Sequence, residues 1–140
     1  MADMAMGSNV APGARVSFRK TMTVAEQAMF TGISGNLGPL YVDAAKARAV
    51  GAPGMLAFEL AVAGLATTCL ARLGGPERRI CALDLKFPAP VPVGGTIEAV
   101  AEVLALEGQH IRCRITCTLD HAGPVVEGEA TLGPAVAKGS

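Results

Sequence analysis

The chain has little charge and almost no aromatic area. Of its 140 residues, 17% are charged and 4% are aromatic, with one tyrosine and no tryptophan. Basic and acidic side chains number 12 each and the basic ones form no block, which argues against nucleic-acid binding through phosphate neutralisation. Hydrophobic residues make up 51%, which predicts one ordered domain with a single core. A surface so poor in charge also predicts a homodimer or larger homo-oligomer.

The cysteines lack the spacing of a metal or redox site. No C-x-x-C pair occurs, and no histidine stands at ligand spacing from a cysteine. Cys69, Cys81, Cys113 and Cys117 are therefore expected to be reduced thiols in the core of a cytoplasmic protein, with no metal bound.

The first residues lack the marks of a signal peptide. Met1–Pro12 has no basic start and no continuous apolar run. We expect a flexible leader over residues 1–12, a single domain over 13–135 and a flexible tail over 136–140.

One segment is apolar enough to be weighed as a membrane span. Met55–Leu73 is about long enough to cross a bilayer. It contains Glu59 and Thr67 and has no flanking positive cluster, so a helix buried inside a domain is favoured.

The first half of the chain carries helix signals. Thr23 and Glu26 form a capping box for a helix ending near Thr31. Asp43 caps a short helix, and Gly54 precedes the long one. The expected helices are Thr23–Thr31, Ala44–Val50 and Met55–Leu73.

Alternating residues predict strands in the second half. Ile97, Ala99, Ala101, Val103 and Ala105 point inward, as do Ile111, Cys113, Ile115, Cys117 and Leu119. The expected strands are Val16–Lys20, Ile80–Phe87, Thr96–Leu106, Ile111–Leu119 and Val125–Leu132. Hairpin-linked strands around one long apolar helix predict an α+β domain with a curved antiparallel sheet wrapped around that helix.

Such a sheet is the hot-dog architecture, and motifs in the chain make it more specific. Ser34–Asp43 reads S-G-N-L-G-P-L-Y-V-D, Pro53–Met55 reads P-G-M, and Leu85–Gly94 reads L-K-F-P-A-P-V-P-V-G. The chain resembles the MaoC-like (R)-specific enoyl-CoA hydratases and dehydratases over about Val16–Leu132. The family has S-G-D-x-N-P-L-H-x-D, H-G-M and F-x-x-P-V-x-x-G-D at these places.

The resemblance implies an enzyme for acyl thioesters, with the CoA thioester as substrate and no cofactor. In such hydratases an aspartate and a histidine hold a water and transfer its protons. The glycine amide before the central helix binds the thioester carbonyl. Gly54 takes that place, and at a helix start its amide is unpaired and near the positive end of the dipole.

The chain departs from the family at the residues that transfer protons. Asn36 replaces the aspartate and can position a water without accepting a proton. Tyr41 replaces the histidine and can donate a hydrogen bond or a proton. Gly38 replaces an asparagine, and the segment between Asp43 and Gly54 is shorter than usual, which predicts a remodelled pocket mouth. Alternatively, Asn36 and Tyr41 only form loop hydrogen bonds in a protein that has lost hydration.

Glu59 is a candidate reserve base. A carboxylate in so apolar a helix needs a partner, and Glu59 can act with Tyr41 or instead satisfy a buried cation or backbone group near a subunit interface. His110 and His121 fall in expected turns, where a solvated role is favoured. The expected substrate-binding residues are Pro39, Asp43, Met55, Phe58 and Val62, of which the apolar ones can equally be core.

The sequence thus predicts a hydratase or dehydratase, or an enzyme of related α-proton chemistry, with catalytic residues Asn36, Tyr41, Gly54 and Glu59. A non-catalytic acyl-thioester binder or assembly subunit is the alternative. A thioesterase is less favoured because Val62-Ala63 stand where hot-dog thioesterases have a carboxylate.

Overall fold

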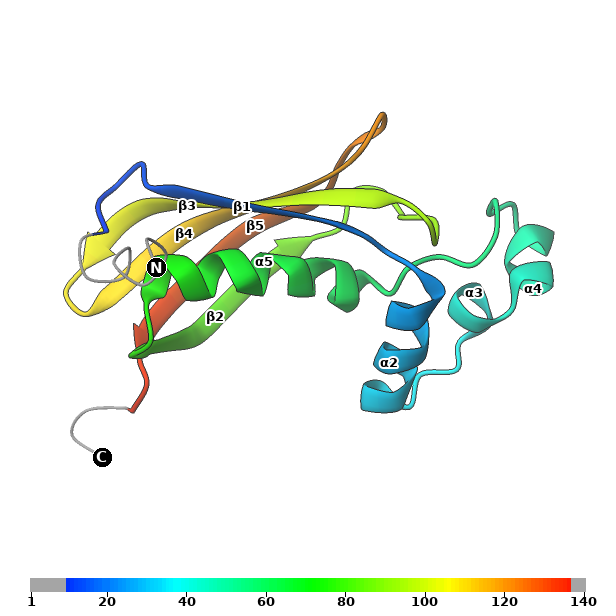
Figure 1. The fold of residues 1–140 in the computed structure, drawn as a ribbon, viewed down its shortest axis with the longest axis horizontal. Helices are drawn as coiled ribbons and strands as arrows, with labels where there is room; N and C mark the ends of the chain where they lie inside the picture. The colour runs from blue at the N-terminus through cyan, green and yellow to red at the C-terminus, as the bar shows by residue number, and fades with distance from the viewer. Residues whose placement is uncertain (1–9, 137–140) are drawn as a thin grey trace.

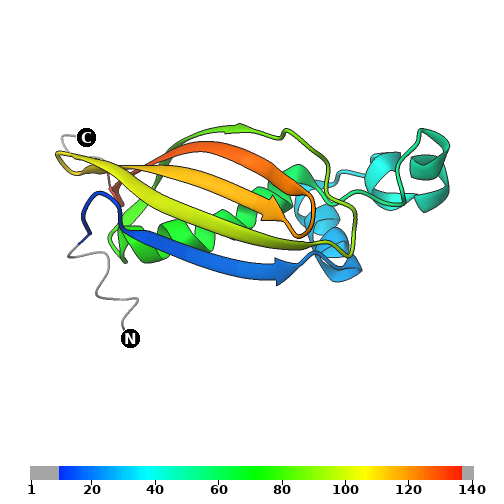
Figure 2. The same cartoon turned by 90° about the horizontal axis from the view of Figure 1, so that it is seen from above.

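A single curved sheet packs on one long helix. The computed structural model describes residues 10–136, so most of the expected leader and tail lies outside the described residues. Figure 1 shows α5 lying along one face of the sheet, and Figure 2 shows the strands spread above it. The α+β hot-dog architecture expected from the sequence is confirmed.

The strands form one antiparallel sheet. Their order is β1-β3-β4-β5-β2, so β1 and β2 are the edges. The strands are β1 Arg15–Thr21, β2 Arg78–Lys86, β3 Thr96–Glu107, β4 His110–Leu119 and β5 Gly123–Pro134. The helices are α2 Val24–Ser34, α3 Pro39–Val42, α4 Ala44–Ala49 and α5 Glu59–Gly74.

Alternation in β3 and β4 puts one row of side chains against the helix. Ile97, Ala99, Ala101 and Val103 are buried, as are Ile111, Cys113, Ile115 and Cys117. They pack on the buried face of α5, which includes Val62, Ala66, Cys69, Leu70 and Leu73. Small residues in β3 leave room for the helix to lie close to the sheet, which buries apolar area on both elements.

A β-bulge reverses the side of the sheet to which Ala105 points. The pairing of β3 with β4 shifts between Val103 and Ala105, and Ala105 then pairs with Arg112 of the outward row. The expectation that Ala105 points inward is therefore wrong, because an extra residue reverses the alternation.

The long helix begins later than expected. Met55–Phe58 is extended: the Ala57 amide donates to the Val91 carbonyl at 2.7 Å, and the Val93 amide donates to the Met55 carbonyl at 3.0 Å. α5 therefore starts at Glu59 and not at Met55. α2 runs past Thr31 to Ser34 and ends at Gly35, whose φ of 71° is the left-handed conformation of a helix end. No helix among the described residues is long and apolar enough to cross a membrane.

All four cysteines are free thiols. Cys69, Cys113 and Cys117 are buried as expected, and burial raises the pKa of Cys113 to about 11 and that of Cys117 to about 12. Cys81 is exposed, so its placement in the core was wrong. It lies at a register shift in the edge strand β2, where its thiol packs over Gly133.

Close approach of β2 to β5 depends on Gly128. A Cβ at this position would overlap the Asp84 carbonyl oxygen and lie 2.9 Å from the Leu85 Cα. Both are backbone atoms, so a side chain here cannot be accommodated by a rotamer change.

We expect Gly128→Ala to lower the free energy of unfolding by about 1–3 kcal/mol or more, because β2 must separate from β5. Gly32→Ala is the matched control: Gly32 lies in α2 with open space around it, and alanine there should raise stability by about 0.5–1 kcal/mol. Urea unfolding measures both, and equal midpoints for the two variants would contradict the packing argument.

Candidate active site

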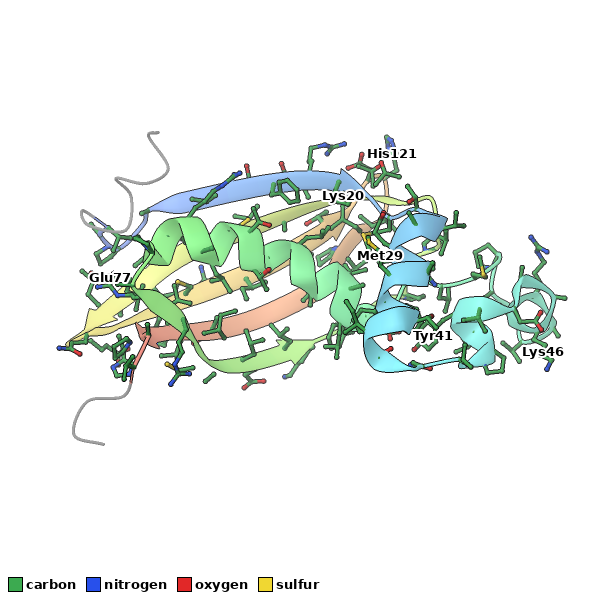
Figure 3. All side chains as sticks on the ribbon, turned by 60° about the horizontal axis from the view of Figure 1, so that its bottom comes forward. Lys20, Met29, Tyr41, Lys46, Glu77 and His121 are labelled. Carbon is green, nitrogen blue, oxygen red and sulfur yellow. The ribbon has the colours of Figure 1, made fainter. Side chains whose placement is uncertain are left out.

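The candidate site lies where α3 and α4, together called the overhang, meet the first turn of α5. α3 and α4 project past the end of the sheet, beyond α2 (Figure 1). Figure 3 places Tyr41 beside α2, with Lys46 at the far end of the overhang. The overhang is joined to the body through Leu56, whose amide donates to the Leu40 carbonyl at 2.9 Å.

Gln27 of α2 joins the overhang, the extended segment and α5. Its side chain is 5% exposed. Its Nε2 donates to the carbonyls of Tyr41 and Leu56, each at 2.9 Å, and its Oε1 accepts from the Phe58 amide at 3.4 Å. The sequence did not identify Gln27, since a glutamine on a capped helix normally faces solvent and no motif marks it.

Tyr41 and Glu59 are hydrogen-bonded to one another. The Tyr41 hydroxyl donates to Glu59 Oε1 at 2.7 Å, an ordinary distance for an O–H···O hydrogen bond. The Tyr41 ring stacks on Phe58 with centroids 4.5 Å apart and an interplanar angle of 17°. Phe58 also contacts Phe30, with centroids 4.8 Å apart. The phenol is thereby held over the start of α5, and Tyr41 is the partner of the Glu59 carboxylate.

This environment keeps the phenol protonated. The hydrogen bond to Glu59, and then burial, raise the pKa of Tyr41 to about 12. Tyr41 is therefore the hydroxyl donor of the pair and Glu59 the acceptor, so the two side chains have different proton-transfer roles.

Asn36 and Gly38 shape the loop beside Tyr41. Asn36 Oδ1 accepts from the Gly38 amide at 2.8 Å, and the Asn36 amide donates to Ser34 Oγ at 3.1 Å. Asn36 Nδ2 makes no hydrogen bond to any described residue. A Cβ at position 38 would lie 3.1 Å from Asn36 Oδ1 and 3.2 Å from Tyr41 Cδ2. The tyrosine ring thus occupies the room that a larger residue at position 38 needs, so the residues at positions 38 and 41 are physically linked.

The Gly54 amide is unpaired, but for a different reason than expected. It does not open the helix, because α5 begins at Glu59. Within residues 10–136, the amides of Gly54 and Met55 have no hydrogen-bond partner, whereas Ala52 donates to the Ala47 carbonyl and Leu56 to that of Leu40. Each of these free N–H groups can donate to a carbonyl oxygen that gains negative charge. The role of Gly54 as an oxyanion donor stays a prediction.

The expected substrate-binding residues occupy different environments. Phe58 and Val62 are 2% and 1% exposed, Met55 is half-buried, and Pro39 is exposed in the first turn of α3. Asp43 caps α4 by accepting from the Lys46 amide at 3.1 Å, as the sequence indicated. Phe58 stacks on Tyr41 and Val62 belongs to the core, so Pro39, Asp43 and Met55 are the members that a ligand can reach directly.

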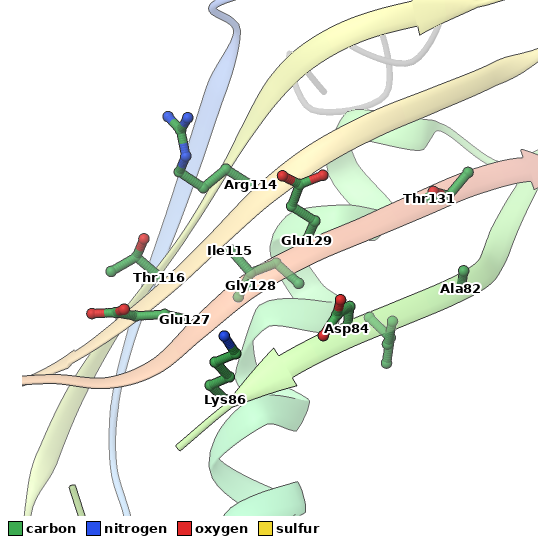
Figure 4. Close-up of a pocket in the computed structure, with 11 residues that line it drawn as sticks. Ala82, Asp84, Lys86, Arg114, Ile115, Thr116, Glu127, Gly128, Glu129 and Thr131 are labelled. Atoms are coloured by element: carbon green, nitrogen blue, oxygen red, sulfur yellow. The ribbon is translucent and has the colours of Figure 1, made fainter. Parts of the chain in front are cut away.

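A shallow groove on the outer face of the sheet lies apart from this pair. It encloses about 670 Å³ and is lined mainly by charged and polar side chains of β2, β4 and β5 (Figure 4). Charged side chains of the groove form ion pairs within the sheet. Arg114 Nη1 lies 3.6 Å from Glu102 Oε1, and Glu129 Oε1 lies 3.2 Å from Arg112 Nη1. The groove fits a solvated sheet surface, and Tyr41 and Glu59 do not line it.

Comparison with known proteins gives a consistent result. Residues 8–122 match the MaoC like domain family. The chain is 34% identical over 128 residues to an (R)-specific enoyl-CoA hydratase of Rhodospirillum rubrum, covering 89% of this chain and 88% of that one. It is 31% identical over 116 residues to a 3-hydroxybutyryl-CoA dehydratase of Methylorubrum extorquens, covering 81% of this chain and 74% of that one. Among solved structures, the (R)-hydratase from A. caviae involved in PHA biosynthesis superposes with a TM-score of 0.85 at 25% identity, covering 90% and 98%.

The Tyr41–Glu59 bond has a direct spectroscopic test. Tyr41 is the one tyrosine in a chain without tryptophan, so tyrosinate absorbance reports this hydroxyl alone. We expect a titration midpoint near 12 in the folded protein and a lower midpoint in Glu59→Gln, which removes the carboxylate charge that disfavours the phenolate.

Circular dichroism at each pH verifies that the protein stays folded during this titration. Glu127→Gln, on the outer face of the sheet, is the control and should leave the midpoint unchanged. A wild-type midpoint near 10, the ordinary value for tyrosine, would contradict the pairing.

Proposed function

Because this chain belongs to the MaoC-like domain family, we propose that it adds water to an enoyl-CoA, and removes water from the 3-hydroxyacyl-CoA, using Tyr41 and Glu59. The observation that carries the proposal is the 2.7 Å hydrogen bond from the Tyr41 hydroxyl to Glu59 Oε1. An acid and a base in direct contact can replace the aspartate and histidine of the family motif.

Hydration then proceeds with a balanced transfer of protons. Glu59 takes a proton from water as the water oxygen bonds to the β-carbon, and the electrons of the double bond move toward the thioester oxygen. The amides of Gly54 and Met55 hold that oxygen as it gains charge. Tyr41 gives its proton to the α-carbon, and Glu59 returns a proton to Tyr41 across their hydrogen bond. Dehydration is the reverse.

Asn36 has the role of orienting the water. Its Oδ1 is engaged by the Gly38 amide, which leaves Nδ2 as a donor toward a water oxygen. An amide cannot take a proton at neutral pH, so Asn36 positions the nucleophile while Glu59 activates it.

We expect wild-type protein to consume crotonyl-CoA, followed by loss of the conjugated-thioester absorbance, and to dehydrate (R)-3-hydroxybutyryl-CoA, the stereochemistry named for the Rhodospirillum rubrum relative. Tyr41→Phe and Glu59→Gln should each lower kcat by about 100-fold or more, the usual contribution of a general acid or base. Glu127→Gln is the matched control and should keep wild-type activity.

Either of two results would contradict the proposal and indicate a different function. Saturable binding of acyl-CoA without turnover would make the protein a thioester-binding subunit. Release of free thiol from the substrate would make it a thioesterase.

We also propose that the protein is a cytoplasmic homodimer joined at the β2 edge. β1 carries Arg15, Arg19 and Lys20, charges that discourage edge pairing. β2 is also charged at Arg78, Arg79, Asp84 and Lys86, but its stretch from Ile80 to Leu83 is uncharged. Leu83 there is 50% exposed, and Phe87 after the strand is 38% exposed. On α5, Leu60 is 64% exposed, so apolar surface flanks the site. Reduced, buried thiols fit a reducing compartment.

Sedimentation should therefore give a dimer for the wild type and a monomer for Leu83→Arg. Leu106→Arg is the control, since Leu106 is 48% exposed near the end of β3 and away from the proposed interface. A monomeric wild type, or a dimeric Leu83→Arg, would contradict the proposed edge pairing.

A further inference from the structure

A guanidinium lies beside the unpaired amides of Gly54 and Met55. Arg48 is in the last turn of α4, and its Nε donates to the Pro53 carbonyl at 3.3 Å. Its Nη2 lies 3.8 Å from the position that a Cβ on Gly54 would occupy. Because Nε alone is engaged by the backbone, the Nη groups remain available to a ligand next to Gly54.

No described carboxylate neutralises this cation. Arg48 forms no ion pair with any residue in the range 10–136. The amides of Gly54 and Met55, beside it, have no hydrogen-bond partner among the described residues. A guanidinium and two N–H donors at one place suit an oxygen that carries negative charge.

We infer that Arg48 is part of the oxyanion site and that its guanidinium donates to the thioester oxygen of the bound substrate. The inference rests on the function proposed above. It also meets a demand of the proposed reaction. The electrons of the double bond move onto the thioester oxygen, and the amides of Gly54 and Met55 are neutral donors to it. A fixed cation at the oxygen stabilises the negative charge that the oxygen gains.

Lys46 offers a matched comparison. It has the same charge on the same short helix, and its backbone amide, not its side chain, bonds to Asp43. Figure 3 shows Lys46 at the outer end of the overhang, away from Tyr41. Arg48→Gln and Lys46→Gln therefore remove one positive charge each from α4, one beside Gly54 and one remote from the site.

The test compares both variants on crotonyl-CoA and on crotonyl-pantetheine, which has the thioester but no phosphate. Arg48→Gln should lower kcat by roughly 10- to 100-fold on both substrates with KM little changed. That loss is smaller than for a buried oxyanion donor because Arg48 is exposed to solvent. Lys46→Gln should keep the wild-type kcat, and millimolar guanidinium should restore part of the activity of Arg48→Ala.

A raised KM confined to the CoA substrate, with kcat unchanged, would make Arg48 a phosphate-binding residue and overturn the inference. Equal activity of Arg48→Gln and wild type would overturn it as well. An unchanged Tyr41 titration midpoint in Arg48→Gln verifies that the site is still folded, and guanidinium rescue of Arg48→Ala separates lost chemistry from lost structure. An inactive wild type refutes the proposed function itself, so the two failures are distinguishable.

Discussion

The side-chain amide of Gln27 joins three segments of the chain that meet at the site. It donates to carbonyls in α3 and in the extended segment before α5, and it accepts from the amide of Phe58. A buried amide stabilises only when its donors and acceptor are satisfied together. Because Gln27 meets that condition, α2, α3 and the start of α5 form one unit, and Tyr41 lies over Phe58 in reach of Glu59.

The residues of the site are linked by space and charge. Tyr41 fills the volume beside Gly38, where any side chain would meet its ring. The hydroxyl of the larger ring extends to Glu59, and the carboxylate in turn stabilises the protonated phenol. Asn36 keeps the loop closed through the Gly38 amide. Changing any one of these residues therefore disturbs its neighbours.

The sequence predicted the sheet well because alternation in β3 and β4 depends only on which face is buried. It failed at Ala105, where an extra residue reverses the alternation, and at Cys81, where a register shift brings a thiol to the surface. The start of α5 was misplaced because Met55–Phe58 has helix-compatible residues, yet hydrogen bonds to Val91 and Val93 draw it into an extended form. Such contacts link distant parts of the chain, and local propensity does not contain them.

The site was predicted unevenly for the same reason. Tyr41 and Asn36 stand in a recognisable motif, and Glu59 stands out as a charge in an apolar helix. Gln27 and Arg48 carry no such signal, because their importance comes from groups far away in the sequence or across a turn. For Gly54 the expected unpaired amide is present, although the helix start invoked to explain it lies at Glu59.

Because α3 and α4 lie past the end of the sheet, this segment can change without changing the sheet. No strand is built from this segment, so insertions or deletions between Asp43 and Gly54 leave the strand register and the buried face of α5 untouched. The same segment supplies Arg48 and borders Tyr41. A change in the length of this segment therefore alters the surroundings of Tyr41 without altering the core.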